Sequence, residues 1–586
     1  MDISATPLLP RGVQPETNAN RNSLNSSARV ERHDNDHHVR VTHPSSRHSQ
    51  QHHSLLSLEP PIIYVVIGLL ILVVIYWAQM AVSFSDEMSK NYPMFIRKLS
   101  PGWIFHRKVD NSDAQFRSFR NNIPALSLVL VVHQAMSVFL GVRFNSGPNA
   151  GHRRMHFTLW FSVVFLTILL GVEMIKLVAV CLIQYVVVKQ FGATWVSPVF
   201  SWCMGLMILF GGAVVDFKFE YVFSWLSWMD KLKGLGMSPA YNFTMLRMIS
   251  FTTDYYWQRL ESVKQFEKHK IDCMTCFNGE STSAFRCSKG RIYASHHVSE
   301  YSLINYMTYL LYAPLFLAGP IICFNDFVAQ IHSPPKEVTL KRIGVAALRW
   351  AGIVLLMELF IHYMYVVAIK DTEAWTGFTS VEIYALGYWN LNHIWLKLTI
   401  IWRFFGLWAL ADGVETVDNM ARCMSNQYSG IQFWRAWHRS YNRWVVRYLY
   451  IPLGGNKRYL LNLIATFTFV AIWHDVKLKL LAWGWLIALF ILPEMILTRL
   501  LCNAKWRTIL GSMHLQMCAV GGVCNILTMM LANLVGFAVG LKGMQEFMYQ
   551  IMHGKALVFF ISVIPGLFLI VHVAFWWEAR QKQRVE

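Results

Sequence analysis

The sequence predicts an all-α, polytopic integral membrane protein with about 10–12 transmembrane or re-entrant helices. The chain has 586 residues, of which 54% are hydrophobic and 14% aromatic. These residues occur in long blocks and do not alternate with polar ones, a pattern typical of membrane spans. One block, at residues 460–492, is interrupted by polar residues, which indicates a broken or re-entrant helix.

The N-terminal 59 residues differ in composition from the rest of the chain. They contain no Phe, Trp, Tyr, Cys or Lys, and six Arg balance six acidic residues. Such a segment buries too little apolar surface to offset its ordering entropy, so we predict a disordered polar tail at 1–59 and one membrane domain at 60–586. The net charge of +19 therefore belongs to the membrane domain, which favours membrane lipids and phosphates as partners and not nucleic acid.

The first predicted span is the 21-residue run from Ile62 to Val82. It is long enough to cross about 30 Å of hydrocarbon, and it starts too late for a cleaved signal peptide. The later apolar runs that predict helices are 123–142, 157–188, 196–215, 301–323, 343–369, 394–411, 460–492, 514–541 and 556–577.

Several ionisable residues fall inside these runs. Glu173 lies near Lys176, and Glu358 lies four residues before His362, on one helical face. Charges at this depth are costly, so they should pair or face a wet cavity. A local pair that fixes helix packing and a role in a substrate path are both open at this point.

The block at 460–492 is interrupted near its middle. Thirteen apolar-rich residues, Leu460–Ile472, precede a polar stretch that begins Trp473-His474-Asp475, and thirteen more follow the stretch. Since neither half spans a bilayer alone, we expect a break that lines a protein-enclosed cavity. His474 is expected at that break.

The segment just upstream, residues 433–450, has the periodicity of an amphipathic helix. Aromatic residues recur at steps of three and four, and arginines recur every four residues. Such a helix suits the headgroup level of a membrane, where guanidinium groups bind phosphates. The aromatic positions are Trp434, Trp437, Tyr441, Trp444 and Tyr448, and the basic positions are Arg435, Arg439, Arg443 and Arg447.

Two histidines in this region suit acyl transfer. Transfer to a hydroxyl group needs a base of near-neutral pKa and a donor that stabilises the oxyanion. Histidine serves best as the base at physiological pH, and His438 precedes His474 by 36 residues.

The ten cysteines do not predict a disulfide scaffold. Cys273, Cys276 and Cys287 share one polar loop, with His296 and His297 downstream. The spacing is irregular for zinc, so we predict no metal site and leave a reduced or disulfide-bonded loop open.

The motifs around the two histidines resemble those of the membrane-bound O-acyltransferase family. The family signature is matched by Phe433-Trp434-x-x-Trp437-His438-x-Ser440-x-x-x-Trp444, then by Tyr450-Ile451-Pro452-Leu453-Gly454-Gly455, and then by Trp473-His474. Further matches, such as Ala318-Gly319-Pro320-Ile321-Ile322 and Arg422-Cys423-Met424-Ser425-Asn426, resemble its Gup (glycerol uptake) branch.

This resemblance implies helices that enclose a tunnel, acyl-CoA as co-substrate without a further cofactor, and His474 as the essential residue. His438 matches the second site of O-acyltransferases, where the protein-acylating branch has Asp. We therefore expect His474 and His438 to be catalytic. The predicted substrate-binding residues are Arg435, Arg439, Arg443, Trp437, Asn442 and Trp473.

The Gup branch further implies transfer of a long-chain acyl group to the glycerol hydroxyl of a lyso-glycosylphosphatidylinositol (lyso-GPI) anchor, in the endoplasmic reticulum membrane. Two alternatives remain open. The intramembrane Glu358 and His362, with the name of the branch, allow polyol transport or symport. Similarity to the Hedgehog-acylating branch allows acylation of a secreted protein.

Overall fold

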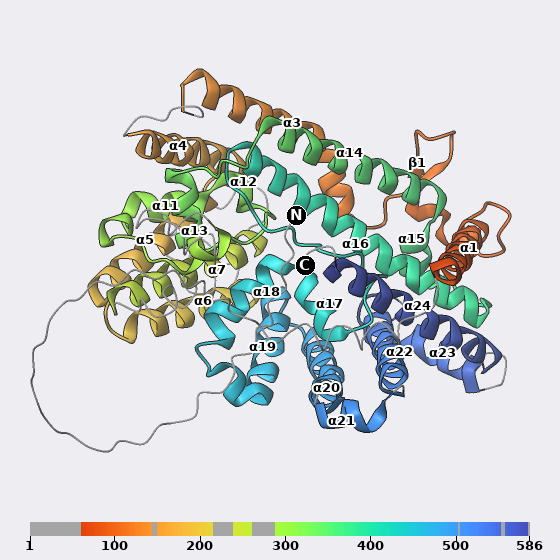
Figure 1. The fold of residues 1–586 in the computed structure, drawn as a ribbon. Helices are drawn as coiled ribbons and strands as arrows, with labels where there is room; N and C mark the ends of the chain where they lie inside the picture. The colour runs from red at the N-terminus through yellow and green to blue at the C-terminus, as the bar shows by residue number, and fades with distance from the viewer. Residues whose placement is uncertain are drawn as a thin grey trace, which may run out of the picture.

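A computed structural model describes residues 60–142, 149–214, 238–260, 287–501, 504–511, 513–538, 540–552 and 557–583. Within these ranges almost all regular structure is helical (Figure 1). A single two-stranded antiparallel sheet pairs β1 (Leu99–Pro101) with β2 (Lys108–Asp110) in this part of the chain. The predicted tail at 1–59 lies outside the described residues, so the division into tail and membrane domain stays a prediction.

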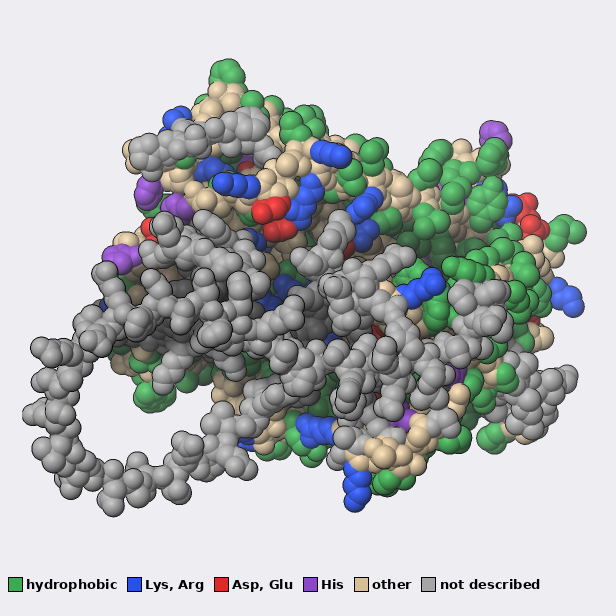
Figure 2. All heavy atoms as spheres, in the orientation of Figure 1, with side chains coloured by type: hydrophobic (Ala, Val, Ile, Leu, Met, Phe, Trp, Pro, Cys, Tyr) green, Lys and Arg blue, Asp and Glu red, His purple; other side chains and the backbone are tan. Residues whose placement is uncertain are grey.

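Nine helices in the described ranges are long and apolar enough to cross a membrane. They outline a polytopic membrane protein, which confirms the predicted fold class. Helix α1 (Pro60–Phe84) illustrates the lipid-facing surface, because Val65, Leu69 and Leu72 are exposed. Hydrophobic side chains cover much of the right-hand side of the view around α1 (Figure 2). The candidate spans are Ile63–Phe84, Ala114–Phe139, Ala150–Leu170, Glu173–Phe191, Leu340–Tyr363, Ser380–Ala411, Leu480–Leu501, Met513–Gly536 and Val563–Gln581.

Helix α16 (Ser380–Ala411) is a long, largely buried helix that contacts several other helices. It has 32 residues, begins with a capping box between Thr379 and Glu382, and buries residues along its whole length. It packs beside α14 (Leu340–Tyr363) and α3 (Ala114–Phe139), which lie along one edge of the molecule (Figure 1).

The four ionisable residues named above, Glu173, Lys176, Glu358 and His362, have partners within the protein. Glu358 accepts hydrogen bonds from the Arg120 guanidinium and from Trp103 Nε1, and His362 Nδ1 bonds the Glu358 carbonyl at 2.7 Å. Lys176 donates to Glu173 at 2.9 Å. Of the two possibilities left open for Glu358 and His362, the geometry favours a structural pair, since neither residue lines the large cavity described below.

The apolar run at 301–323 is not a span, contrary to the helix we expected there. It divides into α11 (Leu303–Leu311), α12 (Ala313–Phe316) and an irregular stretch. The guanidinium of Arg247 donates to the carbonyls of Leu310 and Leu315 at 2.6 Å, so it satisfies backbone groups that the break leaves open. This region is an aromatic protein core formed with α4 (Ala150–Leu170), α5 (Glu173–Phe191), α6 (Val196–Val214), α7 (Ser238–Arg259) and α13 (Phe324–His332).

The C-terminal part contains the break that we predicted at His474. Helix α19 (Tyr459–His474) ends there and α20 (Leu478–Leu501) begins after a short turn. One part of the prediction is wrong: α20 extends to Leu501 and is long enough to span, so only α19 is short.

The predicted continuous helix at 433–450 is also wrong. The segment forms α17 (Gly430–Ala436), α18 (Arg439–Val445) and a π-helical turn at Val446–Tyr450. Trp437 is extended and His438 is left-handed, so the chain changes direction between the two helices.

The described ranges contain further elements around these helices. They are α2 (Tyr92–Phe95), a 3-10 turn at Ile96–Lys98, α10 (Ser288–Tyr293), a 3-10 turn at Val298–Glu300, α15 (Val366–Asp371), a 3-10 turn at Gly455–Arg458, α21 (Ala504–Leu510), α22 (Met513–Asn533), a π-helical turn at Leu534–Ala538, α23 (Gly540–Met552) and α24 (Leu557–Gln583).

Candidate active site

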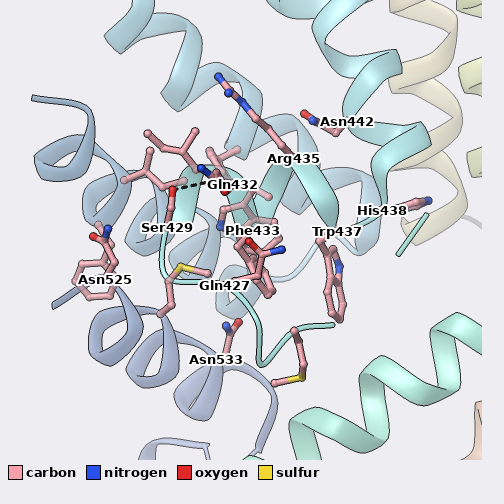
Figure 3. A pocket seen from close by; sticks show the side chains of 18 of the residues that line it. Gln427, Ser429, Gln432, Phe433, Arg435, Trp437, His438, Asn442, Asn525 and Asn533 are labelled. Atoms are coloured by element: carbon pink, nitrogen blue, oxygen red, sulfur yellow. Dashed lines mark hydrogen bonds between the residues drawn. The ribbon is translucent and has the colours of Figure 1, made fainter. Parts of the chain in front are cut away.

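A cavity of about 2030 Å³ lies between α16, α17, α18, α19, α20 and α22. It exceeds the 300–1,000 Å³ range of ordinary ligand pockets. Aliphatic side chains of α16, among them Leu391, Ile394 and Leu398, form part of its wall. Polar side chains of the α17 region and of α22 face the same space (Figure 3). The cavity can therefore hold an apolar chain and a polar group together.

The cavity brings the two predicted catalytic histidines together. His438 and His474 both line it. They are close enough for a charge on His474 to disfavour a charge on His438. Both lie outside the nine candidate spans.

The backbone at His438 has an unusual conformation that neighbouring chain supports. Its φ of 43° and ψ of 51° are left-handed, which is uncommon for a residue other than glycine. Asn419 holds the turn: its carbonyl accepts from the Arg439 N–H, and its Oδ1 accepts from the Ser440 N–H at 3.0 Å. Ser440 Oγ in turn accepts from the Ile321 N–H at 2.8 Å. Strain maintained by such contacts is typical of functional sites.

The imidazole of His438 is enclosed by aromatic rings. It stacks on Trp402 of α16 with ring centroids 4.4 Å apart and on Tyr441 at 5.1 Å. This burial, with a smaller effect of His474, holds the pKa of His438 well below its usual range. Its Nε2 is buried and has no hydrogen-bond partner among the described residues. The residue is thus a neutral imidazole with one nitrogen available.

His474 is held at the last turn of α19 through the residue before it. Trp473 Nε1 donates to the Asn242 carbonyl at 3.2 Å, and Asn242 Nδ2 donates to the Trp473 carbonyl at 3.0 Å. The Trp473 ring also stacks on Tyr441 at 4.4 Å. These contacts join α7, α18 and α19 at one point.

His474 is a neutral base in this setting. Its side chain is exposed to the open space of the cavity, while the many protein atoms nearby partly bury the imidazole and keep bulk water away from it. That burial lowers the pKa of His474 to about 4, because a charged imidazole is poorly solvated there. The side chain is therefore unprotonated at neutral pH and can accept a proton.

Tyr441 is a site residue that the sequence reasoning missed. Its ring stacks on both His438 and Trp473, and it lines the cavity. Its hydroxyl is buried and has no hydrogen-bond partner among the described residues. Tyr441 follows His438 by three residues, a spacing that could have identified it as a neighbour of the histidine. We instead interpreted it as one of the regularly spaced aromatic residues of a single helix.

The structure places four of the six predicted substrate-binding residues on the cavity. Arg435, Trp437, Asn442 and Trp473 line it, whereas Arg439 and Arg443 do not. The fourth arginine of the series has a structural role: Arg447 donates to Asp254 at 2.9 Å in a buried ion pair.

Arg499 of α20 is a second cationic residue at the cavity, and the sequence reasoning did not identify it. It lies over the Tyr459 ring at 4.4 Å, and both Arg435 and Arg499 are close enough to Tyr450 to act on it electrostatically. Neither guanidinium forms an ion pair with a described carboxylate. They are therefore available to an anionic ligand.

Of the three cysteines in the polar loop, the structure describes Cys287. Cys273 and Cys276 lie outside the described residues, and Cys287 accepts the Gly290 N–H at the start of α10. Within the described ranges, no three His, Cys, Asp or Glu side chains are grouped to hold a metal.

Comparison with known proteins gives a family match and several relatives. A model of the MBOAT, membrane-bound O-acyltransferase family, matches residues 180–540. The membrane-bound O-acyltransferase GUP1 of Saccharomyces cerevisiae is 40% identical over 518 residues, which cover 85% of this chain and 87% of the relative. GUP2 of the same yeast is 35% identical over 531 residues, covering 87% and 85%. The protein-cysteine N-palmitoyltransferase HHAT of Mus musculus is more distant, at 28% identity over 291 residues, covering 46% and 56%.

Proposed function

Because the chain belongs to the membrane-bound O-acyltransferase family and is an acyltransferase of the GUP1 type, we propose that it transfers a long-chain acyl group from acyl-CoA to a lipid hydroxyl. The observation that carries this proposal is the pair of neutral imidazoles, His438 and His474, on one large cavity. The aliphatic wall of the cavity suits an acyl chain, and Arg435 with Arg499 suits phosphate groups.

His474 is the general base in the proposed mechanism. Its free imidazole nitrogen takes the proton of the acceptor hydroxyl as the oxygen attacks the thioester carbonyl carbon. The tetrahedral intermediate then collapses, the carbon–sulfur bond breaks, and the CoA sulfur takes the proton back from His474. One ester forms, one thioester is consumed, and the base is regenerated.

His438 and Tyr441 supply hydrogen bonds to the oxyanion in this proposal. Both have a buried polar atom without a partner in the described structure, His438 Nε2 and the Tyr441 hydroxyl. With its proton on Nε2, His438 donates, as does Tyr441. Preorganised donors in a buried site stabilise the charge that develops on the carbonyl oxygen.

The acceptor that we propose is a lyso-GPI anchor in the endoplasmic reticulum membrane. Support comes from the similarity to the Gup branch and from a cavity whose polar lining residues lie beside apolar walls, as an acceptor with a polar headgroup and an acyl chain requires. His438 stands where protein acylation would favour Asp, so a hydroxyl acceptor is the better fit. Trp437, Asn442 and Trp473 complete the proposed substrate contacts, and Arg439 and Arg443 are left for substrate groups outside the cavity.

The test is acyl transfer by purified protein from oleoyl-CoA to lysophosphatidylinositol, the lipid part of a lyso-GPI anchor. His474→Ala should reduce turnover by about 10² to 10⁴-fold. His156→Ala is the control, because His156 is exposed on α4 and does not line the cavity. Wild-type turnover in His474→Ala would exclude His474 as the base.

The acceptor in cells is tested separately by the anchor lipids of cells that lack the protein. We expect shortened or lyso-form anchors, restored by the wild-type gene and not by His474→Ala or His438→Ala. If such cells have normal anchors and a secreted protein loses its acyl label, the acceptor is a protein and not lyso-GPI.

A further inference from the structure

Three amide side chains face one part of the cavity, which we call the amide lobe: Gln427, Asn525 and Asn533. Gln427 precedes α17, and the two asparagines belong to α22. Asn525, Met529 and Asn533 are spaced by four residues and so share one helical face, and all three line the cavity. Figure 3 shows the three amides around the space in front of the α17 segment.

No protein group in the described structure satisfies these amides. Gln427 Oε1 is buried without a hydrogen-bond partner, and the side chains of Asn525 and Asn533 form no hydrogen bond with a described residue. The buried Gln427 Oε1 costs free energy while it has no partner, and the half-exposed Asn525 and Asn533 are polar residues in a membrane span, where such residues usually serve function. The lobe is therefore built for a polar ligand.

The charged groups around the lobe are already occupied. Glu494 accepts hydrogen bonds from the Ser429 hydroxyl and, at 3.1 Å, from the Ile431 N–H. Glu578 accepts from Arg422 at 2.9 Å and from the Tyr428 hydroxyl at 2.7 Å. Arg435 extends away from the lobe (Figure 3). The lobe thus offers neutral groups that both donate and accept. A hydroxyl group can use both functions, whereas a phosphate would use only the donors and an ammonium only the acceptors.

We propose that the amide lobe binds an uncharged, hydroxyl-rich part of the acceptor headgroup, such as a cyclitol or sugar ring. This inference rests on the proposed function, because it assigns the headgroup of the same acceptor. Holding the ring fixes the position of the reacting hydroxyl relative to His474, so that remote binding energy orients the reaction. The anionic phosphate of the same lipid is left to Arg435 and Arg499.

Two lipids of equal charge test this assignment. Lysophosphatidylinositol carries a cyclitol, and lysophosphatidylethanol has the same phosphodiester without a polyol. Equilibrium binding of each to the purified full-length protein, and acyl transfer to each from oleoyl-CoA, are measured for the wild type, Asn525→Leu, Asn533→Leu and the double variant. Met529→Leu is the matched control, since it lies on the same helical face and carries no amide.

We expect the wild type to bind lysophosphatidylinositol at least about tenfold more tightly, and each asparagine substitution to weaken that binding by about tenfold. Binding of lysophosphatidylethanol and the KM for oleoyl-CoA should not change, and Met529→Leu should behave as wild type. Equal affinity for the two lipids in the wild type, or an equal loss for both in the variants, would overturn the proposal.

The binding and transfer measurements separate this proposal from the proposed function. Selective binding that the asparagine variants lose, without any acyl transfer, supports the lobe and contradicts the proposed function. Acyl transfer without headgroup selectivity contradicts the lobe alone. Competition by free myo-inositol or glycerol as strong as that of the lysolipid would assign the lobe to a free polyol, and would overturn the headgroup assignment.

Discussion

At the scale of single residues, the protonation of His474 sets the pH range of the reaction. Burial lowers the pKa of His474 to about 4, so the base stays neutral as the pH falls until it nears that value. We expect kcat/KM to be flat between about pH 6 and 8 and to fall below about pH 5. Initial rates across this range measure it, with a return to pH 7 to exclude denaturation. An acid limb at the ordinary histidine pKa would contradict this environment for His474.

The Tyr441 hydroxyl can be removed without breaking a contact seen in the structure. Because it has no partner, Tyr441→Phe should leave thermal stability nearly unchanged, while the loss of one oxyanion donor should lower kcat by about 10²-fold. The KM for acyl-CoA should change little. Turnover and thermal unfolding of the purified variant measure both effects.

Tyr309→Phe is the control for Tyr441→Phe. Its hydroxyl donates to the Ile322 carbonyl at 2.7 Å, and Tyr309 does not line the cavity. This control should lose stability and keep kcat. If both variants lose stability and kcat together, Tyr441 has a structural role only.

Sequence reasoning identified some site residues and missed others for physical reasons. His474 and His438 stand out because their motif is long, and both line the cavity. Arg499 was missed because only the tertiary fold brings it to the cavity, and Tyr441 was missed because its helical spacing fits a structural aromatic residue equally well. Asn525 and Asn533 could have been recognised as polar residues repeated on one face of an apolar span.

At the scale of elements, the break between α17 and α18 shows where periodicity fails. Steps of three and four predicted one helix over 433–450, but the left-handed His438 divides it. Contacts from distant segments, namely Asn419 on the backbone and Trp402 on the ring, stabilise that conformation. Local sequence does not contain this information. In contrast, the break after His474 was predictable, because polar residues interrupt an apolar run.

The joint between α7 and α19 should control turnover through the position of His474. Asn242→Ala removes the hydrogen bond that its side chain donates to the Trp473 carbonyl, so the end of α19 is less firmly fixed. We expect kcat to fall by about 10- to 100-fold with little change in KM, since small misplacements of a catalytic group are costly. Steady-state kinetics with oleoyl-CoA and lysophosphatidylinositol measure the two parameters.

Asn122→Ala provides the comparison for Asn242→Ala. Asn122 Nδ2 donates to the Ser118 carbonyl within its own helix, and the residue does not line the cavity. Its kinetics should match the wild type. A rise in KM without loss of kcat in Asn242→Ala would show that Asn242 contacts substrate and does not position His474.

At the scale of the whole molecule, the sequence predicts the membrane-spanning frame better than the protein core inside it. Spans facing lipid, such as α1, are uniformly apolar and easily recognised. The buried run at 301–323 is as apolar as a span, yet it folds as α11 and α12 against other helices. Hydropathy does not distinguish a lipid environment from a protein interior, so tertiary packing decides between them.

The pair of Arg120 and Glu358 links two of these spans, and its loss tests whether the molecule works as an enzyme or as a transporter. The carboxylate on α14 accepts from the guanidinium on α3, and both side chains are largely buried. Glu358→Gln should destabilise the protein by about 3–5 kcal/mol, because Arg120 keeps its charge without a counter-ion. Thermal unfolding in detergent measures this, with the exposed Glu337→Gln as control.

Acyl transfer per folded molecule should stay at the wild-type level, since Glu358 does not line the cavity. A proton-coupled polyol transporter would instead lose labelled glycerol uptake in proteoliposomes on this substitution while His474→Ala retained it, and that pair of results would replace acyl transfer as the function of the membrane domain.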